Sequence, residues 1–231
     1  IRELKIKVAE KGQSLADDIA RVAAARDALP NARLKVDANM GYTLGGALDA
    51  LRKLCEYGII YAEQPVASIE DMAALRFAIA KERLPARIAA DESIRKAEDP
   101  LKVARANAAD LMVIKAAPLG GVRRALALVE QAQLPAVVSS ALESSVGIGV
   151  GASLAASLPT LRYGCGLGTV SLMAEDVTDE PLIARDGFMD LRAITPSPQR
   201  LERLATDEQT RQWWVERVTA CYRVLERACG L

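Results

Sequence analysis

The chain has 231 residues, of which 51% are apolar, enough for one substantial hydrophobic core. Thirty basic residues balance thirty acidic ones, so net charge favours neither a nucleic-acid nor a membrane-surface partner. The sequence contains no histidine, which excludes Ser-His-Asp triads, histidine bases and histidine-bound zinc. Acid–base chemistry must then come from other side chains, and a metal site must be built largely from oxygen ligands.

Apolar, β-branched runs alternate with amphipathic stretches along most of the chain, which predicts a parallel α/β fold. In chain order, we expect strands at residues 4–8, 34–38, 59–63, 87–91, 111–116, 136–140 and 161–164. Helices are expected between them, at residues 15–29, 44–57, 69–83, 100–107, 122–133 and 146–158.

Seven strands separated by six helices predict a (β/α) barrel of the TIM type over residues 1–170. A closed barrel of eight strands needs one more strand, and its natural place is before Ile1. The competing fold is a doubly wound open sheet, but the glycine-rich phosphate turn usual in that fold is not seen. Residues 171–231 are expected to form a C-terminal extension of loop, extended segment and amphipathic helix, which packs on the barrel or on what precedes it.

Charged residues stand at the carboxyl ends of five successive expected strands. They are Lys7, Asp37, Glu63, Asp91 and Lys115, at intervals of 24 to 30 residues. Because catalytic groups of such a barrel project from this end, these side chains are expected to meet at one mouth. A single carboxylate there is usually a helix cap or a surface ion pair, but three on consecutive strands would repel one another. We therefore expect the three carboxylates to bind Mg²⁺, with Mn²⁺ as the other possibility.

Lys7 is the expected base, because no histidine is available. A lysine base needs a pKa lowered from ~10.4 toward ~7–8. Lys5 lies on the same strand face as Lys7, and its like charge, a nearby cation and partial burial would all favour a neutral Lys7.

Five short motifs carry a resemblance to a known family. They are KIK at residues 5–7, VDAN at 36–39, AEQP at 62–65, ADES at 90–93 and IK at 114–115. Together they resemble the enolase superfamily, in its muconate-cycloisomerase-like branch, over about residues 1–190. The resemblance implies a barrel preceded by a capping domain whose loops close over the mouth. Neither that domain nor the first barrel strand is recognisable in this sequence.

Two further segments, KAAPLGG at residues 115–121 and SSALESSVG at 139–147, look most like the o-succinylbenzoate synthases of actinobacterial type. That resemblance implies a hydro-lyase converting 2-succinyl-6-hydroxy-2,4-cyclohexadiene-1-carboxylate to o-succinylbenzoate in menaquinone biosynthesis. Lys7 would take the α-proton and return it to the departing hydroxyl. Lys115 would face the other side of the ring, as a cation over the enediolate.

The remaining candidates are expected to bind substrate or to orient the reacting groups. They are Lys5, Asn39, Glu92, Ser93, Ser139, Ser140 and Ser144. Ser144 either begins a helix whose backbone N–H groups hold a substrate carboxylate or merely caps that helix. The expected partner is a small carboxylate, with no nucleic acid and no membrane.

Two other functions remain open. A racemase or epimerase of N-acyl amino acids or dipeptides would use Lys7 and Lys115 as bases on opposite faces. A non-catalytic binding barrel would have no need for such a lysine pair around a metal site. The four cysteines, Cys55, Cys165, Cys221 and Cys229, lack CxxC spacing and are expected to be reduced thiols of a cytoplasmic protein.

Overall fold

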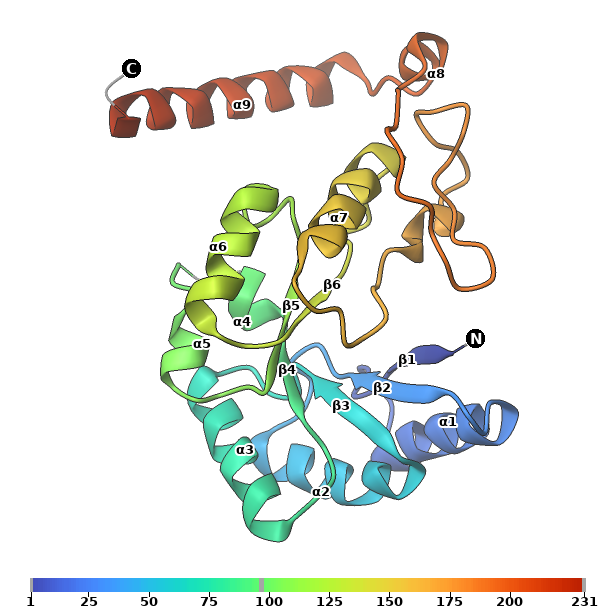
Figure 1. The fold of residues 1–231 in the computed structure, drawn as a ribbon, viewed down its shortest axis with the longest axis vertical. Helices are drawn as coiled ribbons and strands as arrows, with labels where there is room; N and C mark the ends of the chain where they lie inside the picture. The colour runs from blue at the N-terminus through green and yellow to red at the C-terminus, as the bar shows by residue number, and fades with distance from the viewer. Residues whose placement is uncertain (1, 96–97, 230–231) are drawn as a thin grey trace.

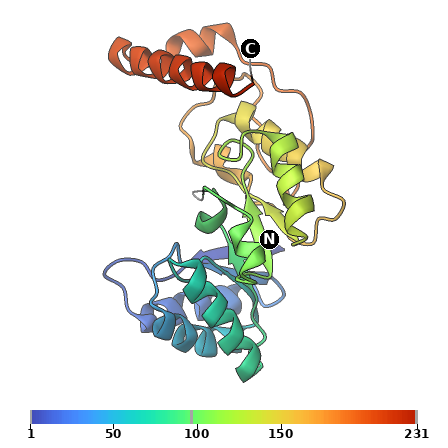
Figure 2. The same ribbon diagram turned by 90° about the vertical axis from the view of Figure 1, so that its left-hand side faces the viewer.

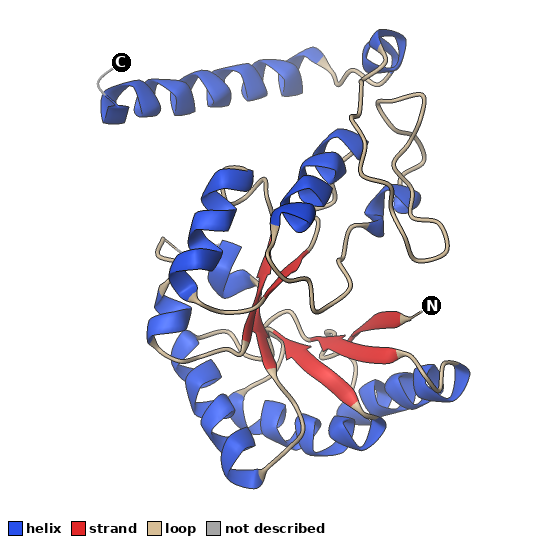
Figure 3. Cartoon of the chain, viewed as in Figure 1, coloured by secondary structure: helices blue, strands red, loops and turns tan. Residues whose placement is uncertain are grey.

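A computed structural model of the chain describes residues 2–95 and 98–229. Six parallel strands form one curved sheet in the order of the sequence (Figures 1 and 3). These strands are β1 (Glu3–Lys7), β2 (Arg33–Asp37), β3 (Ile59–Glu63), β4 (Ile88–Ala90), β5 (Leu111–Ile114) and β6 (Ala136–Val138). Because neighbouring strands are also neighbours in sequence, the sheet is not doubly wound, and the barrel-type expectation is confirmed in this respect.

Helices join the strands and lie around the outside of the curved sheet (Figure 1). They are α1 (Leu15–Ala28), α2 (Leu44–Leu54), the 3₁₀ turn η1 (Cys55–Tyr57), α3 (Ile69–Glu82), α4 (Glu92–Arg95), α5 (Lys102–Arg105), α6 (Val122–Ala132) and α7 (Ser145–Ser157). Side chains start the first three long helices: Ser14 makes a capping box with Asp17, Thr43 caps α2 and Ser68 caps α3.

Alternation along the strands divides the buried apolar residues between two clusters. Residues such as Leu34, Ile88 and Met112 face the helices and form the larger cluster. Tyr61, Leu111 and others face inward and form the smaller one, which lies on the concave side. The inner face at β3 to β6 is therefore filled by side chains, as in other barrels, and does not form a pore.

The expected strand at residues 161–164 is not found, and this prediction was wrong. Gly166 makes an isolated bridge to Ser139, but the preceding backbone is held by side chains of β1 and β2. The Gly164 N–H donates to Glu3 (2.8 Å), and Lys35 Nζ donates to the Gly164 carbonyl (3.0 Å). A strand needs a neighbouring backbone to complete its ladder, and these contacts supply side chains instead. The described strands consequently form a half-barrel, not the closed barrel that was expected.

The C-terminal residues after the half-barrel contain a 3₁₀ turn, η2 (Gly168–Leu172), and two helices, α8 (Pro198–Arg203) and α9 (Glu208–Cys229). Residues 176–194 contact α7: Asp176 accepts from Ser145, and Ile194 lies against Gly149. Helix α9 stands away from the helices around the sheet in both views (Figures 1 and 2), with its large apolar side chains exposed. None of the described helices has the length and apolarity that crossing a membrane requires.

Candidate active site

The carboxyl ends of the first three strands lie in register. Lys7 of β1 is the pairing partner of Asp37 of β2, which in turn pairs with Glu63 of β3. Asp91 directly follows β4, and Lys115 directly follows β5. The five charged residues expected at the mouth therefore stand at adjacent positions along one edge of the sheet.

The three carboxylates are buried: Asp37 and Glu63 are each 1% exposed and Asp91 is 2% exposed. Lysine ammonium groups hold all of them. Lys5 Nζ lies 2.8 Å from Glu63 and 3.1 Å from Asp37, so one ammonium group bridges two strands. Lys115 Nζ donates to both oxygens of Asp91, at 2.7 and 2.9 Å. Buried carboxylates require such cationic partners, because isolated charges are costly to desolvate.

Burial raises the pKa of Glu63 to about 7, and the charges of Asp37 and Asp91 act in the same direction against the opposing effect of Lys5. Burial would also raise the pKa of Asp37, but Lys5 and Lys7 outweigh it and lower that pKa. The neighbouring lysines thus stabilise the charged form of Asp37, whereas burial still favours the protonated form of Glu63. An all-oxygen donor set of three carboxylates fits a hard divalent cation.

In the described part of the chain, no three His, Cys, Asp or Glu side chains are already spaced as a set for a metal ion. The contacts give a physical reason, because Lys5 lies between Asp37 and Glu63, while Lys115 covers both oxygens of Asp91. For all three carboxylates to bind one cation, Lys5 and Lys115 would have to release them.

The two lysines expected to react differ in their surroundings. Lys115 is buried, with 10% of its side chain exposed, whereas the Lys7 side chain is 51% exposed. The expected partial burial of Lys7 is therefore weak. Its ammonium group donates to Asp37 (2.7 Å) and to the Asn39 side-chain oxygen. The positive charge of Lys5 was expected to favour a neutral Lys7. The Lys5 ammonium group, however, is itself paired with Glu63 and Asp37.

Among the expected supporting residues, Asn39 and Glu92 lie at the mouth, whereas Ser93 faces a buried glutamine. Asn39 Nδ2 donates to Glu92 Oε1 (3.3 Å). Ser93 instead binds Gln64, whose side chain is fully buried and accepts from the N–H groups of both Asp91 and Ser93. Sequence reasoning did not assign a role to Gln64, although it directly follows Glu63 in the AEQP motif.

The serines after β6 lie beside the end of β5, because the Ser139 N–H donates to the Ile114 carbonyl (3.0 Å). Ser140 accepts a hydrogen bond from Thr169. Ser144 takes the N-cap position of α7, but its side chain makes no capping hydrogen bond. Asp176 instead accepts from the backbone N–H of Ser145 (3.1 Å) and from its hydroxyl. A carboxylate of the chain itself thus occupies part of the helix terminus that was considered for substrate.

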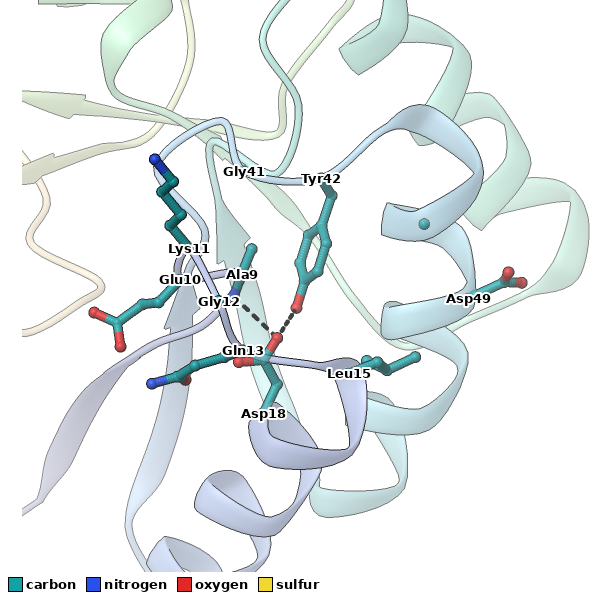
Figure 4. Close-up of a pocket in the computed structure, with 11 residues that line it drawn as sticks. Ala9, Glu10, Lys11, Gly12, Gln13, Leu15, Asp18, Gly41, Tyr42 and Asp49 are labelled. Carbon is teal, nitrogen blue, oxygen red and sulfur yellow. Dashed lines mark hydrogen bonds between the residues drawn. The ribbon is translucent and has the colours of Figure 1, made fainter.

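A cavity of about 440 Å³ lies beside the mouth, between the loops that follow β1 and β2 (Figure 4). None of the five strand-end charged residues lines it. Beneath it, buried Asp18 accepts from the Ala9 N–H (2.9 Å) and the Tyr42 hydroxyl (2.6 Å), as the dashed lines in Figure 4 show. Arg21 joins Asp18 to the Lys7 carbonyl (2.6 Å). This cluster fixes the loop that follows Lys7, and no sequence motif indicated it.

Comparisons with known proteins agree with this geometry. The family of enolase C-terminal domain-like proteins matches residues 1–196. The chain is 52% identical over 225 residues to o-succinylbenzoate synthase of Mycolicibacterium smegmatis, with 97% of this chain and 68% of that protein covered. It is 50% identical over 230 residues to o-succinylbenzoate synthase of Mycobacterium tuberculosis, with 99% and 68% covered.

Among solved structures, muconate lactonizing enzyme from Pseudomonas putida is similar, with a TM-score of 0.77 and 28% sequence identity. The aligned region is 89% of this chain and 58% of that enzyme. Muconate cycloisomerase from Pseudomonas fluorescens also has a TM-score of 0.77, with 29% identity over 87% of this chain and 57% of that one. The chain therefore spans somewhat more than half the length of these structural neighbours.

Proposed function

Because this chain belongs to the o-succinylbenzoate synthase family, within the enolase C-terminal domain-like proteins, we propose that it catalyses the dehydration that gives o-succinylbenzoate. The substrate would be 2-succinyl-6-hydroxy-2,4-cyclohexadiene-1-carboxylate, a small carboxylate, and the pathway menaquinone biosynthesis in the cytoplasm. The cofactor would be Mg²⁺, or Mn²⁺ in its place.

One observation of the structure carries this proposal. Two lysines from β1 and from the end of β5 flank three buried carboxylates that belong to the strands between them. Lys7 is accessible from solvent and Lys115 is buried, so a bound substrate would meet an ammonium or amine group from each flank. A simple structural ion-pair network would not need carboxylates at the ends of three adjacent strands.

The proposed chemistry assigns one role to each lysine. Neutral Lys7 removes the α-proton of the substrate, and the electron pair of the broken C–H bond moves into the carboxylate to give an enediolate. The electron pair of the enediolate then forms the new ring C=C bond as the C–O bond breaks, and the Lys7 ammonium returns the proton to the departing hydroxyl, which leaves as water. Lys115 stays protonated and places its charge near the delocalised anion.

Asp37, Glu63 and Asp91 would hold the divalent cation. When bound, that cation supplies positive charge that stabilises the negative charge developing on the substrate carboxylate. The Lys5 ammonium, which bridges Asp37 and Glu63, would release them and remain near as a neighbouring positive charge.

The test is an assay of the protein with magnesium on the cyclohexadiene acid, followed by product absorbance. We expect Lys7→Ala and Lys115→Ala each to lower kcat at least 100-fold, since positioned acid–base groups contribute ~10²–10⁴. Lys102→Ala is the matched control, because Lys102 pairs with Glu70 on the surface. No turnover by magnesium-loaded wild type, or substantial turnover by either active-site variant, would overturn the proposal.

The racemase alternative rests on the same two lysines and needs its own measurement. N-Succinyl amino acids should be incubated with the protein and followed by optical rotation. Dehydration of the cyclohexadiene acid with no change in the rotation of the N-succinyl amino acids supports the dehydratase assignment. Racemisation that is faster than dehydration would replace it.

A further inference from the structure

A continuous polar path joins the two lysines across the mouth, outside the set of three carboxylates. Lys7 donates to the Asn39 side-chain oxygen, and Asn39 Nδ2 donates to Glu92 Oε1 (3.3 Å). Arg95 Nη2 donates to the same Glu92 oxygen (2.8 Å). On its other side, Arg95 Nε lies 3.2 Å from Asp91 Oδ1, and Lys115 binds Asp91. Arg95 is therefore the residue through which Glu92 contacts Asp91.

Glu92 is an unusual residue to bury at this place. It is only 5% exposed, although it adjoins Asp91, which is 2% exposed and also anionic. Its Oε2 atom is buried and makes no hydrogen bond to any residue that the structure describes. Two neighbouring buried carboxylates are costly without a cation between them, and Arg95 is the cation in contact with both.

The two contacts of Arg95 differ in their hydrogen-bond geometry. The contact with Glu92 is a well-formed hydrogen bond, whereas Nε, at 3.2 Å from Asp91, lacks hydrogen-bond geometry within the described part of the chain. In this state Lys115 donates to both oxygens of Asp91 and competes for them. Release of Asp91 by Lys115 would free Oδ1 to accept a hydrogen bond from Arg95 and would leave Oδ2 for another cation.

A simpler explanation is that Arg95 only stabilises the short helix α4, since it lies three and four residues after its two partners. Exposed pairs of that spacing contribute little to helix stability. Here, however, both acidic partners are buried, and Glu92 also accepts from Asn39, in the turn that follows β2. The contacts therefore extend beyond one helix and reach the side chain that binds Lys7.

We propose that Arg95 is a positioning residue that orients Asp91 for the divalent cation, with Glu92 holding the guanidinium group in place. The inference rests on the proposed function, because it assumes that Asp91 binds the cation. Glu92 in turn fixes the Asn39 amide, whose oxygen accepts from Lys7. Arg95 does not touch the reacting atoms and acts only through Asp91 and Glu92.

The experiment measures magnesium binding by isothermal titration calorimetry, with no substrate present. Partners that orient a metal ligand typically contribute 10–100-fold to metal affinity. Arg95→Met should therefore weaken magnesium binding at least 10-fold, while Arg95→Lys, which keeps the charge, recovers part of the loss. Arg105→Met is the control, because Arg105 is an exposed arginine paired with Asp99 on a neighbouring surface segment.

A second measurement separates positioning from folding. If Arg95 and Glu92 act as a pair, the effect of Arg95→Met on magnesium affinity should shrink at least threefold in a Glu92→Gln background. A purely structural role would lower the melting temperature of the metal-free protein and leave the affinity of the folded fraction unchanged. Should Arg95→Met fail to fold, the comparison of Arg95→Lys with wild type, alone and with Glu92→Gln, gives the same test.

The outcomes are distinct. Wild type that binds no magnesium would contradict the proposed function and with it the role of Asp91. Wild type and Arg95→Met with affinities within twofold of each other would contradict the positioning role alone. Effects of the two substitutions that simply add would show that Glu92 does not act through Arg95.

Discussion

Gln64→Leu would test how the end of β3 holds the end of β4. Gln64 is fully buried, and its Oε1 accepts hydrogen bonds from the backbone N–H groups of Asp91 and Ser93, both at 3.1 Å. Its Nε2 donates to the Val66 carbonyl (3.0 Å) and to Ser93 Oγ (2.8 Å). Leucine has a similar volume, so the substitution removes these bonds without opening a large cavity.

The magnitude follows from the two N–H groups left without their acceptor. Each unsatisfied buried group costs about 1–3 kcal/mol, and the additional apolar contacts of leucine offset part of this. We expect a net loss of about 2–4 kcal/mol in the free energy of unfolding, a large share of a typical total of ~5–15 kcal/mol. Magnesium affinity should fall at least 10-fold as well, because one of those N–H groups belongs to Asp91.

The assay is urea unfolding of metal-free protein, followed by far-ultraviolet circular dichroism. Gln131→Leu is the matched control, because Gln131 is exposed in α6 and its substitution should change stability by less than about 0.5 kcal/mol. A loss below about 1 kcal/mol for Gln64→Leu, or a loss equal to that of the control, would refute the reasoning.

Three other predictions concern the same half-barrel. A Cβ at Gly41 would lie 2.6 Å from the Ala9 carbonyl oxygen, so Gly41→Ala should destabilise the protein by about 1–3 kcal/mol. An unchanged free energy of unfolding in urea would contradict this prediction. Lys35→Met removes one of the two cationic partners of partly buried Glu3, which keeps Arg33, and should cost about 1–3 kcal/mol, which a melting temperature equal to wild type would rule out. Because burial raises the pKa of Glu63 to about 7, metal-free protein should be most stabilised by this group below its unfolded pKa and lose about 3 kcal/mol as the pH rises through 7. Glu63→Gln should lack that part of the decline when unfolding is measured between pH 5 and 8.

The sequence predicted the first six strands because each contains a short apolar run, and these runs alternate along the chain with amphipathic helical stretches. It also predicted that Lys7, Asp37 and Glu63 would be neighbours, since parallel strands of similar length end at one edge. The strand at residues 161–164 failed for a physical reason. Its composition suits a strand, but pairing depends on a neighbouring backbone, and here Glu3 and Lys35 bind that segment through side chains.

The supporting residues were harder to predict than the charged ones. Gln64 and Arg95 act through specific hydrogen bonds to groups on other segments, which residue type and spacing do not reveal. For Arg95 a weak signal existed, because it stands four residues after Asp91 and would share a helix face with it. For Asp176 there was none, since its contact with Ser145 joins residues 31 positions apart.

The exposed helix α9 also determines what the tryptophan fluorescence of the protein reports. Both tryptophans of the chain, Trp213 and Trp214, lie in α9, where their rings meet edge to face at 4.7 Å between centroids and Arg217 lies over one of them. Intrinsic tryptophan fluorescence therefore reports the surroundings of this one helix, while the half-barrel is spectroscopically silent at those wavelengths. A change in emission on adding substrate or another protein would be a signal from α9, and a denaturation curve recorded by fluorescence would not follow the loss of the sheet.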